Sequence, residues 1–391
     1  MNSKHWIDRI RTSSQTDPAP WYEVEDVDQV FSPALLIYPD RVQANLDRMI
    51  EMAGGADRLR PHVKTHKMPA VVEMNIAAGI TRFKAATIAE AEMTAAAGAK
   101  DVLLAVQPVG PNIQRFVRLV ESYPSCEFSC LVDDSSILTQ LETEFRAANV
   151  QGRVWLDLDV GMNRTGIAPS YAATELVRLI DASKHVRLAG LHVYDGHLHD
   201  TDTEHLKQQF DESTKPFWDW FGEVQRNLGH TVMLVAGGTP TSTFWQAESR
   251  SRNVESETGA GTTVLWDAGQ PTFSPAMPFE PAALVMTRVI SRPTEFDVCL
   301  DLGHKAVASE MPLPRVKWLN FDADHEVVGH NEEHMVLRMT RPSPLRCGDV
   351  LYGIPVHICP TVALHQHAEC VKDHRVIEKW PVVARNRTLT I

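Results

Sequence analysis

Short apolar segments alternate with helical patterns over more than half of this 391-residue chain. Between residues 33 and 265, apolar runs such as 34–38 and 154–159 are each followed by a stretch with the apolar spacing of a helix. These runs are apolar throughout, as in parallel strands that are buried on both faces. About eight such units predict an α/β fold, a (β/α)8 TIM-type barrel. The alternative, a doubly wound open sheet, favours a Gly-x-Gly-x-x-Gly turn after its first strand, and the chain has none there.

The expected barrel strands are short and lie between helices with clear start and stop signals. Gly79 and Gly98, for example, follow two of the helical stretches, where glycine commonly ends a helix. The strands are expected at 34–38, 59–64, 82–85, 101–106, 127–132, 154–159, 188–194 and 231–235.

The pattern changes near residue 282, where helical spacing gives way to β-like segments separated by turns. This pattern predicts a second, mainly antiparallel β domain. We therefore expect a barrel over 30–265, and a β-rich domain made of 1–29 and 266–391. Its strands are expected at 282–290, 296–302, 326–328, 334–339, 350–353 and 382–391.

Composition narrows the class of protein. The formal net charge of −12 and the pI near 5.8 argue against binding to nucleic acid or to an anionic membrane surface. No apolar run approaches the roughly 20 residues of a membrane span. The first twenty residues lack the apolar core of a signal peptide. Together with six scattered cysteines, which favour free thiols, these features predict a cytoplasmic enzyme.

The segment 60–67, Arg-Pro-His-Val-Lys-Thr-His-Lys, concentrates lysines and histidines at the expected end of the second strand. Burial of a lysine there would lower the pKa of its ammonium and free the amine to form a Schiff base with a carbonyl. Pyridoxal phosphate is the carbonyl cofactor most often held in this way. A solvated basic loop is the alternative interpretation of the same residues.

Polar residues also follow the other expected barrel strands. Since the active site of such a barrel lies where the strands end, we expect these side chains to converge. They are Lys64 and His66 after strand two, Gln107 after strand four, Asp157, Asp159, Asn163 and Arg164 after strand six, His192, Tyr194 and Asp195 after strand seven, and Gly237, Gly238 and Thr239 after strand eight.

Two of these loops suit an anionic cofactor. The backbone of Gly237 and Gly238 can approach a phosphate closely, and Thr239 adds a hydroxyl donor. Arg164 carries a permanent charge that could bind a phenolic oxygen. An ordinary Gly-Gly turn and an arginine paired with Asp157 or Asp159 are the alternatives.

A third motif lies in the expected β domain. His357 and Cys359 would share one side of an extended segment. An imidazole and a thiolate favour a transition metal such as zinc over magnesium or calcium. An incidental histidine beside a buried cysteine is the alternative.

Taken together, these motifs resemble the D-threonine aldolase and D-serine dehydratase family of fold-type III pyridoxal phosphate enzymes, which are related to alanine racemase. The resemblance covers nearly the whole chain from Ser32 onward. The motifs that carry it are Arg-Pro-His-Val-Lys-Thr-His-Lys at 60–67, Asp-Val-Gly-Met-Asn-Arg-Thr-Gly at 159–166, Gly-Gly-Thr at 237–239, Asn-Glu-Glu-His at 331–334 and His-x-Cys at 357 and 359.

The resemblance implies a role for each motif. Lys64 would form the Schiff base with the cofactor. From their positions alone, we also expect His66 and Gln107 to bind the cofactor, and His66 and Lys67 to support Lys64. Arg164 would approach the phenolic oxygen, and Tyr194 would lie beside the pyridine ring. The turn at 237–239 would bind the phosphate, and His357 and Cys359 would bind a divalent metal, zinc or manganese. The assembly implied is a homodimer with shared active sites.

The reaction implied is carried out by a lyase of D-β-hydroxy-α-amino acids. Retro-aldol cleavage to glycine and an aldehyde, as in D-threonine aldolase, is our first expectation. The cysteine of His-x-Cys instead favours a dehydratase of D-serine or D-3-hydroxyaspartate, which forms a 2-oxo acid and ammonia. An amino-acid racemase, with Tyr352 as a second acid/base, and a non-catalytic carrier of pyridoxal phosphate are the remaining alternatives.

Overall fold

The computed structural model describes residues 19–228, 231–273 and 277–391. Contacts divide the chain into two compact units. The parallel-sheet unit comprises Asp47–Gly261 and Asn386–Ile391, and the β-rich unit comprises Thr262–Arg385 with the chain up to Leu46. The expected boundary at residue 30 differs from this division, because 30–46 group with the β-rich unit. Among the described residues, no helix combines the length and apolarity needed to cross a membrane.

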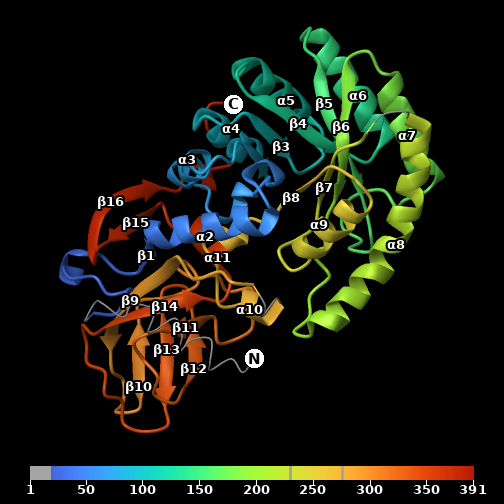
Figure 1. Ribbon diagram of the computed structural model, residues 1–391. Coiled ribbons are helices and arrows are strands. Elements are labelled where there is room, and N and C mark those ends of the chain that lie inside the picture. The colour runs from blue at the N-terminus through green and yellow to red at the C-terminus, as the bar shows by residue number, and fades with distance from the viewer. Residues whose placement is uncertain (1–18, 229–230, 274–276) are drawn as a thin grey trace. The chain divides into compact units, whose positions relative to one another are not determined.

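Seven parallel strands form the curled sheet of the parallel-sheet unit, in the sequential order β2 to β8 (Figure 1). Its strands are β2 Arg82–Ala85, β3 Asp101–Leu104, β4 Glu127–Val132, β5 Gly152–Leu158, β6 Val186–Val193, β7 Leu234–Ala236 and β8 Ser256–Thr258. Its helices are α3 Pro69–Ala77, α4 Ile88–Ala96, α5 Pro111–Ser122, α6 Ser135–Ala147, α7 Tyr171–Ala182, α8 Thr203–Leu228 and α9 Ser242–Ser251. The unit also contains the 3-10 helices η2 Ala56–Arg58 and η3 Val63–Thr65.

Side-chain caps set the starts of several connecting helices. Thr87 accepts a hydrogen bond from the Glu90 amide at the start of α4, and Asp134 accepts two from the first turn of α6. Ser170 caps α7 in the same way. Each cap satisfies amides that the helix itself leaves without partners. Helices α4 and α6 therefore begin soon after β2 and β4 end, whereas a longer loop, which carries Arg164, separates β5 from α7.

The middle members of the series of expected barrel strands are observed, whereas the expectations at the start and at the end of the series are wrong. The segment 34–38 forms β1 (Ala34–Ile37), which pairs with β9 and β15 of the other unit's sheet. The segment 59–64 makes isolated bridges only, Leu59 with Thr258 and His62 with Lys84, and then turns into η3. The expected last strand is β7, and β8 was missed. A short apolar run indicates burial in a sheet, but it does not indicate which sheet.

The β-rich unit contains a nine-stranded, mainly antiparallel sheet. Its main path runs β12-β13-β10-β9-β1-β15-β16, with β14 paired to β9 and β11 to β14. The strands are β1, β9 Ala283–Ser291, β10 Asp297–Leu300, β11 Val316–Trp318, β12 His325–His330, β13 Met335–Met339, β14 Val350–Pro355, β15 His367–Lys372 and β16 Arg375–Pro381. The remaining elements are α10 Gln270–Phe273, α11 Ile358–Leu364, η1 Val27–Gln29, η4 Thr262–Val264 and η5 Val383–Arg385, while α2 Pro39–Ala53 crosses the division between the units.

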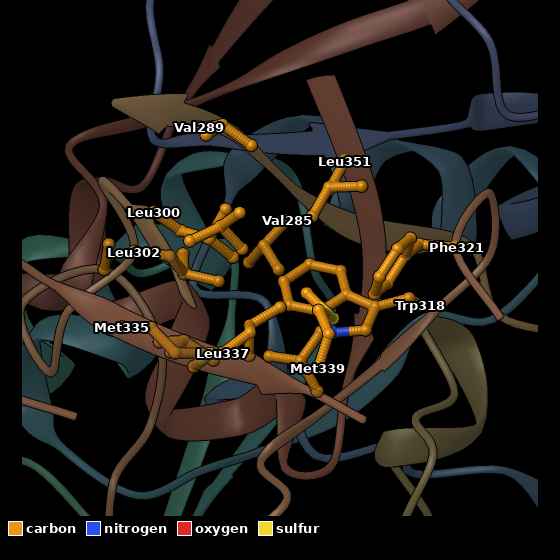
Figure 2. Close-up of a cluster of buried hydrophobic side chains, with 14 residues drawn as sticks. Val285, Val289, Leu300, Leu302, Trp318, Phe321, Met335, Leu337, Met339 and Leu351 are labelled. Atoms are coloured by element: carbon orange, nitrogen blue, oxygen red, sulfur yellow. The ribbon is translucent and has the colours of Figure 1, made fainter. Parts of the chain in front are cut away.

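Several sequence expectations for this unit need correction. β11, β15 and β16 were missed, and the segment expected as a strand at 382–391 begins with η5 instead. The expected antiparallel character holds for every pairing except that of β1 with β15, which is parallel. Figure 2 shows the apolar core of this unit, in which Trp318 and Phe321 lie among aliphatic side chains of β9, β10, β13 and β14.

A buried arginine joins the first and last parts of the parallel sheet. The Arg60 side chain is 2% exposed, and its Nε donates to Glu257 of β8 at 2.6 Å while its Nη1 donates to Asp101 of β3 at 2.6 Å. Burial would raise the pKa of Asp101, but Arg60 and Arg153 outweigh it and hold that pKa below its usual value. The backbone extends the link, since the Arg60 amide donates to the Thr258 carbonyl and the Lys84 amide to the Pro61 carbonyl. The segment that leads to Lys64 is therefore held between β8 and β2.

This network predicts a large cost for Arg60→Met. The substitution would remove the buried partner that Glu257 and Asp101 share and leave them only the more exposed Arg82 and Arg153. Breaking a buried ion pair in this way costs about 3–5 kcal/mol. The matched control is Arg178→Met, whose exposed pair with Glu175 contributes about 0.5 kcal/mol or less. Urea denaturation of the two variants measures both effects, and equal losses of stability would contradict the structural role of Arg60.

Candidate functional site

Lys64 lies in η3, where the chain leaves the bridge between β8 and β2. The Lys64 amide donates to Nδ1 of His62 at 3.4 Å, and the Lys64 Nζ lies 5.8 Å from the centre of the Tyr194 ring. The sequence expectation that Lys64 ends a strand is wrong in its secondary structure. The expected proximity of Lys64 to Tyr194 is present.

The loop after β5 presents Arg164. Asp159 accepts hydrogen bonds from the amides of Gly161 and Asn163, and Asp133 accepts one from Gly166. These bonds shape the loop from its own backbone. The Cζ of Arg164 lies 5.1 Å from the centre of the Tyr194 ring. Arg164 makes no ion pair with Asp157 or Asp159 among the described residues, so the alternative interpretation of this arginine is not observed.

Tyr194 is the centre of the cluster. It follows β6, and a side chain at Gly196 would approach its ring to 2.5 Å, so glycine is required for the chain to turn back against the ring. Two lysines and one arginine surround the ring, because Lys84 Nζ also lies 5.8 Å from its centre. We call Lys64, Lys84 and Arg164 the cation cluster. Within the described part of the chain, none of its members has a carboxylate within ion-pair distance.

Lys84 was missed in the sequence, although it belongs to β2 and is 3% exposed. Its Nζ lies 2.8 Å from Nε2 of His192, and Nδ1 of His192 lies 2.7 Å from Oδ1 of Asp157. Burial and the nearby Lys64 lower the pKa of Lys84 to about 7, although Asp157 opposes the shift. Burial and the nearby Lys84 also lower the pKa of His192, so its imidazole is neutral. The signal in the sequence was a lysine inside an otherwise buried strand.

The expected phosphate turn follows β7. Gly237 adopts φ +84°, and a Cβ there would meet the Trp245 ring at 2.5 Å. The Gly238 amide already donates to Asp195 Oδ1 at 2.8 Å, so it is not free for an anion as the sequence suggested. Thr239 is buried, and the buried Oγ1 of Thr241, at the start of α9, has no partner among the described residues. An unpartnered hydroxyl at a helix N-terminus is a suitable donor to an anionic group.

His66 and Gln107 support the loops. His66 is 2% exposed, burial lowers its pKa to about 3, and its Nδ1 accepts the Met68 amide at 3.2 Å. Gln107 Oε1 accepts the amides of Asp133 and Asp134, which places it beneath the loop that Asp133 shares with Gly166. Their observed bonds are made to the protein itself, so the geometry shows them as positioning groups.

The expected metal pair lies in the β-rich unit, but on a different element from the one predicted. His357 is the N-cap residue of α11 and Cys359 lies in its first turn, so the segment is not extended. Burial would lower the pKa of His357, but the Cys359 side chain, Asp267 and Glu310 raise it to about 9. The Cys359 side chain also contacts the Thr262 hydroxyl at 3.7 Å. Among the described residues, no group of three or more histidine, cysteine or acidic side chains could hold a metal.

Two carboxylates beside this pair were not expected from the sequence. Glu310 Oε1 lies 2.5 Å from Nδ1 of His357. Asp267 is buried, and it accepts the amides of Gly269, Gln270 and Ile358, the last of which begins α11. Burial raises the pKa of Asp267 to about 6. The acidic residues thus orient His357 and the start of the helix that carries Cys359.

The residues of the parallel-sheet unit therefore converge much as the sequence predicted. Lys64 and Arg164 share the Tyr194 ring, and the turn at 237–239 is joined to the same loop through Asp195. His357 and Cys359 form a separate pair in the β-rich unit. Tyr352, the residue on which a racemase would depend, is 5% exposed in β14, and its hydroxyl accepts the Val24 amide.

Residues 37–251 match the family described as alanine racemase, N-terminal domain. The chain belongs to this family. Residues 282–371 match a second description, putative serine dehydratase domain. The two matches correspond to the two regions that the sequence pattern distinguished: alternating apolar and helical segments first, and β-like segments after them.

Two curated relatives are similar over most of their length. D-threonine aldolase from an Arthrobacter species is 27% identical over 94% of this chain and 96% of its own. D-threo-3-hydroxyaspartate dehydratase from a Delftia species is 28% identical over 89% of this chain and 96% of its own. The expected resemblance to the aldolase and dehydratase family is confirmed.

Solved structures agree on the fold. D-threonine aldolase from Filomicrobium marinum has a TM-score of 0.80 with 27% identity, and covers 91% of this chain and 96% of its own. A cysteine-to-alanine mutant of D-threo-3-hydroxyaspartate dehydratase, in the metal-free form, has a TM-score of 0.75 with 23% identity over 90% of this chain and 97% of its own. The alanine racemase-like architecture is thus common to both kinds of lyase.

Proposed function

We propose that the protein is a pyridoxal phosphate-dependent lyase of D-β-hydroxy-α-amino acids, and that it cleaves them to glycine and an aldehyde. The observation that carries this proposal is the cation cluster around Tyr194. Three positive groups on one ring, without carboxylate partners, suit a ligand that is both aromatic and anionic. Pyridoxal phosphate has this chemistry. The aldolase and dehydratase relatives support the reaction class.

The fold proposed for this activity is a closed (β/α)8 barrel. The bridges of Leu59 with Thr258 and of His62 with Lys84 support it, because they place residues 59–62 between β8 and β2 as an eighth, very short strand. In this numbering the turn at 237–239 follows the seventh strand. Phosphate sites of such barrels commonly lie after strands seven and eight.

Each residue of the cofactor site has a role in this proposal. Lys64 would hold the cofactor through its amine, Tyr194 would flank the ring, and Arg164 would bind the phenolic oxygen. Thr239 and Thr241 would donate to the phosphate, as the unpartnered Thr241 hydroxyl suggests. When bound, pyridoxal phosphate supplies an electron sink for the charge that develops at Cα.

His357 and Cys359 would hold a divalent metal, zinc or manganese. Their soft and nitrogen donors fit zinc, and two protein ligands leave positions open for water or substrate. Glu310, at Nδ1 of His357, would keep Nε2 available as the ligand atom. The solved dehydratase mutant is described as the metal-free form, which supports metal binding by that relative. A bound metal would lower the pKa of the substrate hydroxyl.

A dehydratase is the second candidate. Its support is Cys359, because the His-x-Cys pattern resembles dehydratases acting on D-serine or D-3-hydroxyaspartate. The two reactions differ in the bond that breaks. Cleavage of Cα–Cβ needs a base at the β-hydroxyl, whereas loss of water needs a base at Cα, for which Lys64 is the nearest candidate. A racemase has less support, because Tyr352 is buried in the apolar core.

Product analysis tests the reaction class. With D-threonine we expect glycine and acetaldehyde in equal amounts, because the cleaved bond joins Cα to Cβ. L-threonine, which presents its groups in the opposite hand, is the control and should not react. A 2-oxo acid with ammonia would instead establish the dehydratase, and D-alanine racemised to L-alanine would contradict both lyase assignments.

Replacement of Lys64 tests the cofactor assignment. The purified protein should absorb visible light through its bound cofactor, and Lys64→Ala should remove this band and lower kcat by at least about 1,000-fold, the order expected for loss of a covalent catalytic group. Lys184→Ala, an exposed lysine between α7 and β6, is the matched control. An unchanged spectrum of Lys64→Ala would exclude Lys64 as the anchor.

Removal of the metal tests the role of His357 and Cys359. Treatment with EDTA should abolish turnover but leave the visible band, and His357→Ala should lower metal content in the same way. Added zinc or manganese should restore the wild-type protein but not the variant. Full activity in a preparation shown by elemental analysis to be metal-free would disprove the metal role. We also propose that the protein is a homodimer, as the family resemblance implies, and sedimentation velocity on the same samples tests this.

A further inference from the structure

We propose that Lys84, held by His192 and Asp157, is an anion-binding positioning residue of the candidate cofactor site, and that it takes up a proton when an anion binds. The ligand chemistry is that of a phosphate monoester or a carboxylate. The inference deepens the proposed function, and rests on it only for the identity of the anion. No motif in the sequence and no comparison assigns this role to Lys84.

The first argument is geometric. Lys84 is 3% exposed, and its only direct polar partner among the described residues is Nε2 of His192 at 2.8 Å. A buried ammonium normally lies against a carboxylate. Here the carboxylate of Asp157 is one residue further away, on the opposite side of the imidazole. Lys84 therefore retains donors that an anion could accept.

The chain of three residues fixes the direction of the lysine. Asp157 accepts from Nδ1 of His192, which leaves the lone pair on Nε2 to accept from the Lys84 ammonium. The amine occupies space that only glycine leaves open at position 259, because a Cβ there would lie 2.8 Å from Lys84 Nζ. The imidazole and the glycine together hold Nζ beside the Tyr194 ring.

The surrounding charges favour an anion. The carboxylates of Asp157 and Asp195 are already engaged, by His192 in one case and by Gly238 and Trp245 in the other. The cations Lys64 and Arg164 share the ring with Lys84 and have no carboxylate within ion-pair distance among the residues that the structure describes. The titratable and charged groups that face Lys84 or its two partners are Lys64, Arg60, His62, Asp157, Arg164, His192 and Asp195.

Proton uptake follows from the same arrangement. Because burial holds the pKa of Lys84 near 7, part of the protein carries a neutral amine at physiological pH. An anion beside Nζ favours the ammonium and raises that pKa, so binding and protonation are linked. The affinity for the anion should be highest below pH 7 and should fall as the pH rises above 7. The fall should be up to about tenfold per pH unit, until the pH reaches the pKa of Lys84 in the complex.

Sulfate on the cofactor-free protein is a direct probe, because sulfate remains a dianion from pH 6 to 9. We expect wild-type protein to bind sulfate about tenfold more tightly at pH 6 than at pH 9, at constant ionic strength in chloride. Lys84→Met should remove most of this pH dependence, while Lys184→Met should keep it. Acetate, measured in parallel, distinguishes the sources: preference for sulfate indicates a phosphate monoester, and preference for acetate indicates a substrate carboxylate.

The Lys84→Arg variant is a second test, which keeps the inference testable if Lys84→Met does not fold. Its guanidinium stays charged at every pH used, so this variant should bind sulfate at pH 9 as tightly as at pH 6. A structural role alone would not produce this gain at high pH. Wild-type affinity that does not change with pH, or that Lys84→Met leaves intact, would overturn the inference.

The same measurements separate this inference from the proposed function. If pyridoxal phosphate does not bind but the sulfate results hold, the cofactor assignment fails and the anion site stands. If the cofactor binds through Lys64 but sulfate binding is independent of Lys84, the opposite conclusion applies.

Discussion

The parallel-sheet unit depends on burying the guanidinium of Arg60. Two carboxylates from strands far apart in the sheet order, Glu257 on the last strand β8 and Asp101 on the second strand β3, converge on this one side chain. A buried arginine is tolerated only where its charge is matched in this way. Because the match is made by distant strands, it also fixes where the segment after Arg60 can run. That segment carries Lys64 four residues later.

At Lys64, the other end of the segment that begins at Arg60, the positive charges are not paired with carboxylates of the described residues. Lys64, Lys84 and Arg164 surround Tyr194 and have no carboxylate partner in the described part of the chain, whereas Arg60, only four residues before Lys64, has two. The contrast separates structural charges from those that can serve a ligand. Lys84 lies against the neutral imidazole of His192, which holds the amine without supplying a countercharge.

The two motifs that distinguish lyase reactions lie on different elements. Lys64 and its neighbours would bind the cofactor, whereas His357 and Cys359 depend on the start of α11, which Asp267 caps through the Ile358 amide. The same Asp267 lies near His357, so the fold of this turn and the donors of the proposed metal site are linked. A change from cysteine at 359 would alter the donor chemistry without changing the helix start.

Much of the fold was predictable from local pattern. The central strands from β2 to β7 were located correctly, because apolar runs bounded by capped helices report burial and length directly. The motif residues Lys64, Arg164 and Tyr194 were also recognisable, since each combines an unusual side chain with a position just after an apolar run. The sequence pattern gave the wrong structure at 34–38, 59–64 and 382–391. The structure of these segments depends on the residues with which they pair, and not on their own composition.

What the sequence determined by itself was the set of chemical groups and the order of the elements. Tertiary structure decided which groups meet. β1 joins the antiparallel sheet because its partners β9 and β15 are far along the chain, and Lys84 joins the cation cluster because β2 lies beside the bridge at His62. The contacts of His192 with Lys84 and with Asp157 join residues that are 108 and 35 positions apart. Local composition contains no information about such contacts, so only the folded chain could reveal them.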